Sequence, residues 1–162
     1  MDTIAFLRHL KAQPGYHDQI VHIEHISARK AEYDVLDKPL AGELQESLEK
    51  HRLCPLYSHQ AEAINRLRQG ENVIIATSSA SGKSLCYNIV VLQQILTEPD
   101  SRALYLFPTK TLAQDQLRVL HQLFSPGIIK PEECATFDGD TPRAERAEIR
   151  KGARIILTNP DM

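Results

Sequence analysis

Residues 73–84 read V-I-I-A-T-S-S-A-S-G-K-S, and this stretch decides the fold class. Its first four residues are apolar and predict a short buried strand. Small residues follow, and an apolar helical pattern begins directly after Gly82, Lys83 and Ser84. A strand, a loop of small residues, Gly-Lys-Ser/Thr and a helix form, in this order, the pattern of a phosphate-binding loop.

Each part of this pattern has a physical reason. Backbone N–H groups of the loop must turn toward phosphate oxygens, which excludes bulky side chains. The start of the next helix adds unpaired N–H groups and the positive end of a helix dipole. Lys83 would reach the β- and γ-phosphates of a nucleotide, and the Ser84 hydroxyl would coordinate Mg²⁺. The sequence therefore predicts a nucleoside triphosphate and Mg²⁺ as ligands, with contacts from Thr77, Ser78, Ser79, Ala80, Ser81, Gly82, Lys83 and Ser84.

The loop departs from the strict pattern G-x-x-x-x-G-K-[ST] at its first position, where Thr77 replaces glycine. The replacement is small, so we expect the loop to close on phosphate with some loss of affinity. For the loop taken alone, the alternative interpretation is a Ser-rich turn between a strand and a helix.

Composition narrows the class of protein. The 162 residues are 42% hydrophobic and 25% charged, which is typical of a soluble globular protein with a core. The net charge is −2, so any contact with nucleic acid must be local. The three cysteines form no C-x-x-C pair, which argues against a disulfide framework or a zinc site. Without a signal peptide or a long apolar run, the sequence predicts a cytoplasmic protein.

Apolar periodicity predicts an α/β fold with a parallel sheet flanked by helices. Four short apolar runs follow Gly70, and helical patterns separate them. The expected strands are 73–76, 103–107, 134–137 and 154–158, and the expected helices between them are 85–97, 109–124 and 142–150. Strands that alternate with helices of this length form βαβ units. Upstream, we expect a helix at 3–11, a β-rich segment at 19–26, and helices at 40–51 and 58–69, with a domain boundary after residue 39.

Four further stretches lie at predicted strand ends or helix starts, where an open α/β sheet binds its ligands. They are Leu56–Gln60 (L-Y-S-H-Q), 108–116 (P-T-K-T-L-A-Q-D-Q), 137–142 (F-D-G-D-T-P) and 158–162 (T-N-P-D-M).

With the phosphate loop, this ordered set resembles the first RecA-like domain of superfamily 2 helicases of the DEAD/DEAH-box type. The stretches resemble, in order, the Q motif, motif Ia, the paired-glycine motif and motif Ib, and the loop resembles motif I. Helicase loops usually carry a further glycine where this chain has Ala80, and Asp140 stands in place of the second paired glycine. The residues within these motifs are similar to those of DNA repair helicases related to bacterial mitomycin repair factor A. The resemblance covers residues 40–162 and is much weaker for residues 1–39.

The resemblance implies roles for individual residues. Gln60 would read the edge of adenine, so the nucleotide would be ATP. Thr109, Lys110, Gly139 and Thr158 would face the backbone of a single nucleic-acid strand, DNA rather than RNA. For Lys110 alone, a solvated charge is the alternative, and Arg143 and Arg146 are expected on a solvated helix face.

The sequence contains no D-E-x-H or D-E-A-D box and no second RecA-like domain. We therefore expect the N-terminal part of an ATP-dependent DNA repair helicase that hydrolyses little ATP by itself. The alternative is a freestanding nucleotide-binding or interaction module. A phosphate-loop kinase is disfavoured, because the stretches like motifs Ia and Ib have no role in one.

Overall fold

The computed structural model describes residues 2–28, 30–98, 100–125 and 127–160. The chain divides into two compact units, Met1–Ala31 and Glu32–Met162. In the first unit, Asp2 caps helix α1 (Thr3–Lys11): its carboxylate accepts hydrogen bonds from the N–H groups of Ile4 and Ala5. The β-rich segment predicted at 19–26 is wrong, since residues 19–26 form no strand. Val21 and Ile26 are 93% and 86% exposed, so no packing holds this segment in a sheet.

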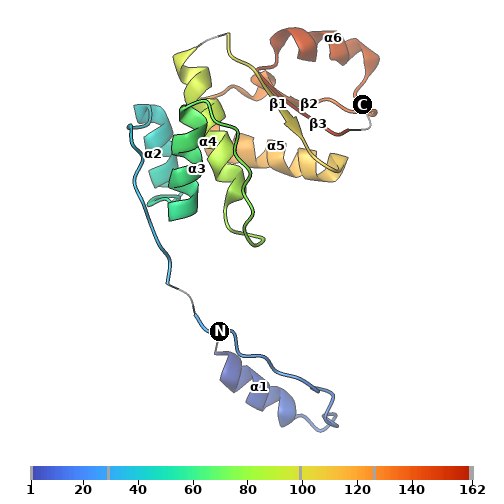
Figure 1. The fold of residues 1–162 in the computed structure, drawn as a ribbon. Coiled ribbons are helices and arrows are strands. Elements are labelled where there is room, and N and C mark those ends of the chain that lie inside the picture. Colours follow the sequence, from blue (N-terminus) through green and yellow to red (C-terminus); the bar gives the residue numbers. More distant parts are fainter. Residues whose placement is uncertain (1, 29, 99, 126, 161–162) are drawn as a thin grey trace. The chain divides into compact units, whose positions relative to one another are not determined.

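The second unit is an α/β structure (Figure 1). Its elements, in chain order, are α2 (Gly42–Lys50), α3 (Ser58–Arg68), α4 (Lys83–Thr97), β1 (Ala103–Leu106), α5 (Lys110–Phe124), the 3-10 helix η1 (Pro131–Glu133), β2 (Cys134–Thr136), α6 (Arg143–Gly152) and β3 (Ile155–Thr158). The three strands form a parallel sheet in the order β1-β3-β2. Among the described residues, none of the helices is long and apolar enough to cross a membrane. The α/β class with a parallel sheet is confirmed.

One predicted strand is wrong, and it is the one that precedes the phosphate loop. Residues 73–76 are not in a strand, and within the described residues they make no backbone hydrogen bond to another segment. Ile74 is 95% exposed. A strand depends on the hydrogen bonds of a neighbouring strand, and here β1 pairs with β3 alone. Leu104 and Leu106 of β1 are also exposed, so apolar side chains remain open both on 73–76 and on β1.

The core lies between the helices and one face of the sheet. Tyr105 of β1 points toward α4, where its hydroxyl donates to the Asn88 side-chain oxygen at 2.9 Å. Burial raises the pKa of Tyr105, so this hydroxyl keeps its proton as a donor. The largest fully buried side chains of the described residues include Leu44, Leu48, Ile64, Ile89, Leu92, Leu120, Ile129, Ile155 and Leu157.

The ends of the three strands are joined by one residue, Thr158. Its carbonyl accepts a hydrogen bond from the N–H of Phe107, which follows β1. Its hydroxyl donates to the carbonyl of Phe137, which follows β2. The loops that follow β1 and β2 are therefore held together at the carboxyl edge of the sheet, the edge at which α/β proteins bind ligands.

Candidate functional site

The phosphate-loop residues lie where the sequence places them, between an extended segment and the start of α4. Gly82 caps α4 with a φ of 77°, in the left-handed region that favours glycine. A Cβ at this position would also collide with the side-chain nitrogen of Gln60. The positive φ therefore favours glycine at position 82, and any larger residue there would force the Gln60 amide to move.

Lys83 reaches back across the loop. Its Nζ donates hydrogen bonds to the carbonyl oxygens of Ser78 at 2.6 Å and Thr77 at 3.0 Å. The Thr77 hydroxyl lies 2.6 Å from the Ser81 hydroxyl, which closes the base of the loop. The ammonium therefore lies over an exposed turn of small residues, where phosphate oxygens could replace the two carbonyls as its partners.

Ala80 adopts a backbone conformation that costs free energy. Its φ is 60°, in the left-handed region that residues with a Cβ rarely occupy. Glycine adopts this left-handed conformation without strain, which explains why helicase loops usually carry glycine at the position of Ala80.

The start of α3 is attached to the loop through Gln60, which is 3% exposed. Its side-chain oxygen accepts from the N–H of Tyr57 at 2.9 Å, and its nitrogen donates to the carbonyl of Gly82 at 3.2 Å. The Nε2 of His59 adds a second link, 3.0 Å from the carbonyl of Ser81. The carboxamide predicted to read adenine thus also holds the loop, with one N–H and one lone pair left over.

An aromatic stack lies beside Gln60, and no sequence pattern indicates it. The rings of Tyr33 and Tyr57 are 5.3 Å apart and 14° from parallel, and Tyr57 stacks on His59 at 5.9 Å. Tyr33 belongs to a segment predicted to precede the domain, but an antiparallel bridge to Tyr57 joins it to the second unit. The two tyrosines, Gln60, Ala80, Gly82 and Ser84 help line one cavity of about 370 Å³. Aromatic faces beside a turn that the sequence predicts to bind phosphate are suited to a planar base.

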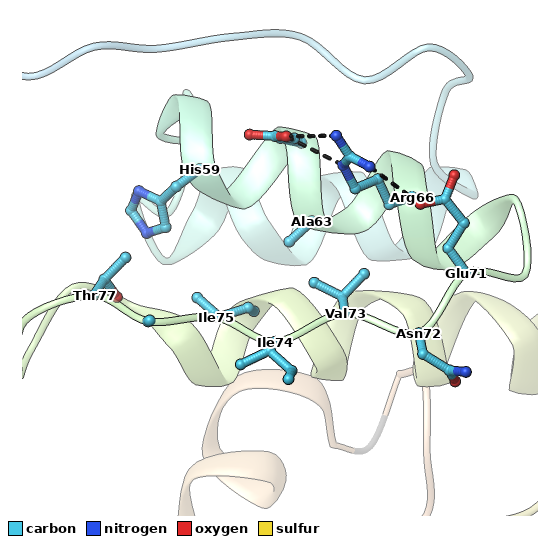
Figure 2. Close-up of a pocket in the computed structure, with 11 residues that line it drawn as sticks. His59, Ala63, Arg66, Glu71, Asn72, Val73, Ile74, Ile75 and Thr77 are labelled. Carbon is cyan, nitrogen blue, oxygen red and sulfur yellow. Dashed lines mark hydrogen bonds and ion pairs between the residues drawn. The ribbon is translucent and has the colours of Figure 1, made fainter.

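A second pocket, of about 340 Å³, lies between α3 and the segment before the loop (Figure 2). Arg66 lies along one side and pairs with Glu62 at 3.1 Å and Glu71 at 3.2 Å. These two carboxylates raise the pKa of Arg66 by hydrogen bonding, and its positive charge is balanced within the wall. The opposite wall includes Val73 and Ile75 of the segment that forms no strand. Because Arg66 is paired with two carboxylates, this pocket is poorly suited to bind a phosphate.

The residues predicted to face nucleic acid divide into two groups. Thr109 caps α5 by accepting the N–H of Leu112 at 3.2 Å, and Lys110 is the first helical residue. A Cβ on Gly139 would lie 3.5 Å from the Lys110 Nζ, so these two residues are neighbours. Thr158 is only 8% exposed, and its hydroxyl is used by Phe137. Asp161, in the stretch like motif Ib, lies outside the described residues.

Arg146 of α6 has a role that its charged surroundings did not predict. It was expected on a solvated face, yet its guanidinium donates to the carbonyls of Thr141 at 3.0 Å and Asp138 at 3.2 Å. It also lies over the ring of Phe137, 5.5 Å from the ring centre. Arg146 therefore holds the loop between β2 and α6. The sequence signal for this role is weak: an arginine in the first turn of a helix, close to the loop that precedes it.

The strained Ala80 yields a testable prediction. Ala80→Gly removes the Cβ from a left-handed residue and should raise the free energy of unfolding by about 0.5–1 kcal/mol, after the entropic cost of an added glycine. Ala76→Gly, in the same exposed segment but without positive φ, should lower it. Urea unfolding followed by circular dichroism measures both; equal effects of the two changes would contradict the strain.

Known proteins share this sequence and geometry. The sequence profile described as DEAD/DEAH box helicase matches residues 57–162. The ATP-dependent helicase HRQ1 of Saccharomyces cerevisiae is 48% identical over 154 residues, which cover 94% of this chain and 14% of that protein. The uncharacterized ATP-dependent helicase YprA of Bacillus subtilis is 39% identical over 145 residues, covering 90% of this chain and 19% of that protein.

The fold is also similar to a solved structure, the DUF1998 helicase MrfA bound to DNA and AMPPNP. The TM-score is 0.84 at 36% sequence identity, covering 98% of this chain and 22% of that one. The chain thus spans less than a quarter of the length of each of these relatives. The predicted resemblance is confirmed: the chain belongs to the DEAD/DEAH box helicase family.

Proposed function

We propose that this chain binds ATP with Mg²⁺ at residues 77–84 and forms the N-terminal part of an ATP-dependent DNA helicase that acts in DNA repair. The observation that carries the proposal is the position of Lys83. Its ammonium lies over an exposed turn of small residues, at the start of α4, while Gln60 fixes the adjacent Gly82. The helicases HRQ1 and MrfA support it, and the MrfA structure contains DNA and AMPPNP.

Adenine would bind beside Gln60. The carboxamide keeps one N–H and one lone pair after its bonds to Tyr57 and Gly82, which is the pair of groups that an adenine edge requires. The ring of Tyr33, at the end of the stack of Tyr33, Tyr57 and His59, lines the same cavity as Gln60 and would stack on the base. Guanine reverses the donor and acceptor along its edge, so the same carboxamide would select ATP over GTP.

Magnesium would bind through the Ser84 hydroxyl. The residue is the second of α4 and lines the cavity that also contains Gly82 and Ala80. A single protein ligand fits Mg²⁺, which usually keeps several waters and takes its other oxygens from substrate phosphates. Bound there, the ion would neutralise charge on the β- and γ-phosphates, while Lys83 would supply the second positive charge.

A single DNA strand would cross the carboxyl edge of the sheet. Thr109, Lys110 and Gly139 form one exposed patch there, with hydroxyl, ammonium and backbone N–H groups that can contact phosphates without reading bases. Thr158 would contribute indirectly, by holding the ends of β1 and β2 together.

The remaining parts of the proposed helicase would pack against apolar residues that are exposed in this chain. Ile74 beside the loop and Leu104 and Leu106 on β1 are exposed, and residues 73–76 make no backbone hydrogen bond to another described segment. Further strands and a second RecA-like domain, from the larger share of the relatives' length, would cover them and complete the sheet. The free cysteines Cys54, Cys86 and Cys134 are consistent with a reducing, cytoplasmic location.

The nucleotide site is tested by Lys83→Ala. Removing the ammonium should weaken ATP–Mg²⁺ binding by about 1.5–3 kcal/mol, the range for a hydrogen bond to a charged group. Lys50→Ala, which removes one exposed lysine charge on α2, is the matched control and should leave affinity unchanged. Isothermal titration calorimetry gives both values. Equal ATP affinity for the wild type and Lys83→Ala would contradict the assignment of the loop.

Hydrolysis by residues 1–162 should be negligible, even with saturating single-stranded DNA. Phosphoryl transfer needs a positioned water and charge stabilisation around the γ-phosphate, and an arginine finger is worth roughly 10³–10⁵ in rate in related enzymes. Lys83 and Ser84 supply one side only, because the sequence has no Asp-Glu box. Steady-state phosphate release is the assay, with Lys83→Ala as background. DNA-stimulated turnover above that background would refute the expectation.

A further inference from the structure

The loop between β2 and α6, residues 138–141, is unusually well fixed for an exposed connection. Asp138 is 4% exposed, and its carboxylate accepts the N–H of Asp140 at 2.9 Å. The N–H of Asp138 in turn donates to the Thr141 hydroxyl at 2.9 Å, and the N–H of Thr141 donates to the Asp138 carbonyl at 3.1 Å. These bonds close a tight turn whose conformation does not depend on a ligand.

Arg146 fixes the same loop from the other side. It donates to the carbonyls of Asp138 and Thr141, and its guanidinium rests on the ring of Phe137. The carbonyl oxygens of the turn are thus directed toward α6. The side chain of Asp140 is directed away from this network and is 79% exposed.

The exposed carboxylate of Asp140 lies on the patch proposed to bind nucleic acid. Its Oδ2 is 2.7 Å from the Nζ of Lys110. Lys110 is 41% exposed and begins α5, so its ammonium is the cation of the Thr109, Lys110 and Gly139 patch. When DNA binds, a phosphate would pair with the ammonium of Lys110. In the structure, the carboxylate of Asp140 already forms that ion pair.

We propose that Asp140 is an internal competitor of nucleic-acid phosphates for Lys110, and that it sets the affinity of this surface for a single strand. The inference rests on the proposed function, because it requires that the patch binds a phosphate backbone. An exposed ion pair is weak enough for a phosphate to displace. Because the turn is fixed, the displaced carboxylate stays close to the bound strand and repels it. Asp140 therefore weakens binding twice, by occupying Lys110 and by its charge.

The test uses residues 1–162 and a fluorescein-labelled oligothymidylate, with binding followed by fluorescence anisotropy. Asp140→Asn keeps the size of the side chain and the backbone N–H bond to Asp138. At low salt it should bind the strand about three- to tenfold more tightly than the wild type, and the difference should shrink as salt is added.

The matched control is Asp115→Asn. Asp115 is a half-exposed residue of α5 that forms an ion pair with Arg118 at 3.0 Å, so the change removes the same charge from a similar pair. It lies five residues beyond Lys110, which puts it roughly 140° around the helix and about 7.5 Å along it. Its gain in affinity should stay within about twofold of wild type, because Asp115 pairs with Arg118 and does not occupy Lys110.

Competition is separated from simple repulsion by repeating Asp140→Asn in a Lys110→Ala background. Competition predicts that most of the gain disappears without Lys110. An equal gain in both backgrounds would overturn the competition, and an unchanged affinity of Asp140→Asn while Lys110→Ala weakens binding would overturn the whole inference. In that last case the proposed surface still stands. Binding that is insensitive to Lys110→Ala, or absent in every variant, would overturn the proposed surface as well.

Discussion

The close approach of the Gln60 side chain to the backbone of Gly82 is the contact on which the candidate site depends. The carboxamide connects the start of α3 to the end of the phosphate loop, and a Cβ on Gly82 would displace it from this contact. It compensates for a missing support, because residues 73–76 are not held in a sheet. In this chain the loop is therefore positioned from the helix side, and the residues proposed to bind the base are joined by hydrogen bonds to the residues proposed to bind phosphate.

The carboxyl edge of the sheet depends on a comparable arrangement. Thr158 links the ends of β1 and β2, and Arg146 fixes the turn after β2. Neither side chain needs to contact DNA to matter for it, because together they determine where Lys110 and Asp140 meet. Both candidate sites thus consist of a few exposed groups held by buried or half-buried polar contacts.

The sequence pattern predicts the features that neighbouring residues determine, and it misses those that depend on contacts between distant residues. The strands at 103–107, 134–137 and 154–158 and a helix after the loop follow from apolar runs, and the structure confirms them, with the helix beginning at Lys83, two residues before the predicted 85. The segment 73–76 was mispredicted because an apolar run forms a strand only beside a partner, and pairing is not local. Tyr33 joins Tyr57 from 24 positions away, and Arg146 binds backbone carbonyls; neither contact leaves a periodic signal in the sequence.

ATP binding at a loop that is clamped to the start of α3 can be measured by amide hydrogen exchange of residues 1–162, with and without ATP and Mg²⁺. We expect slower exchange with nucleotide in two separate segments, residues 78–85 and residues 57–60. The nucleotide should stabilise the loop and, through Gln60 and His59, the helix that holds it. Protection confined to other parts of the chain, or no protection at saturating nucleotide, would contradict this expectation.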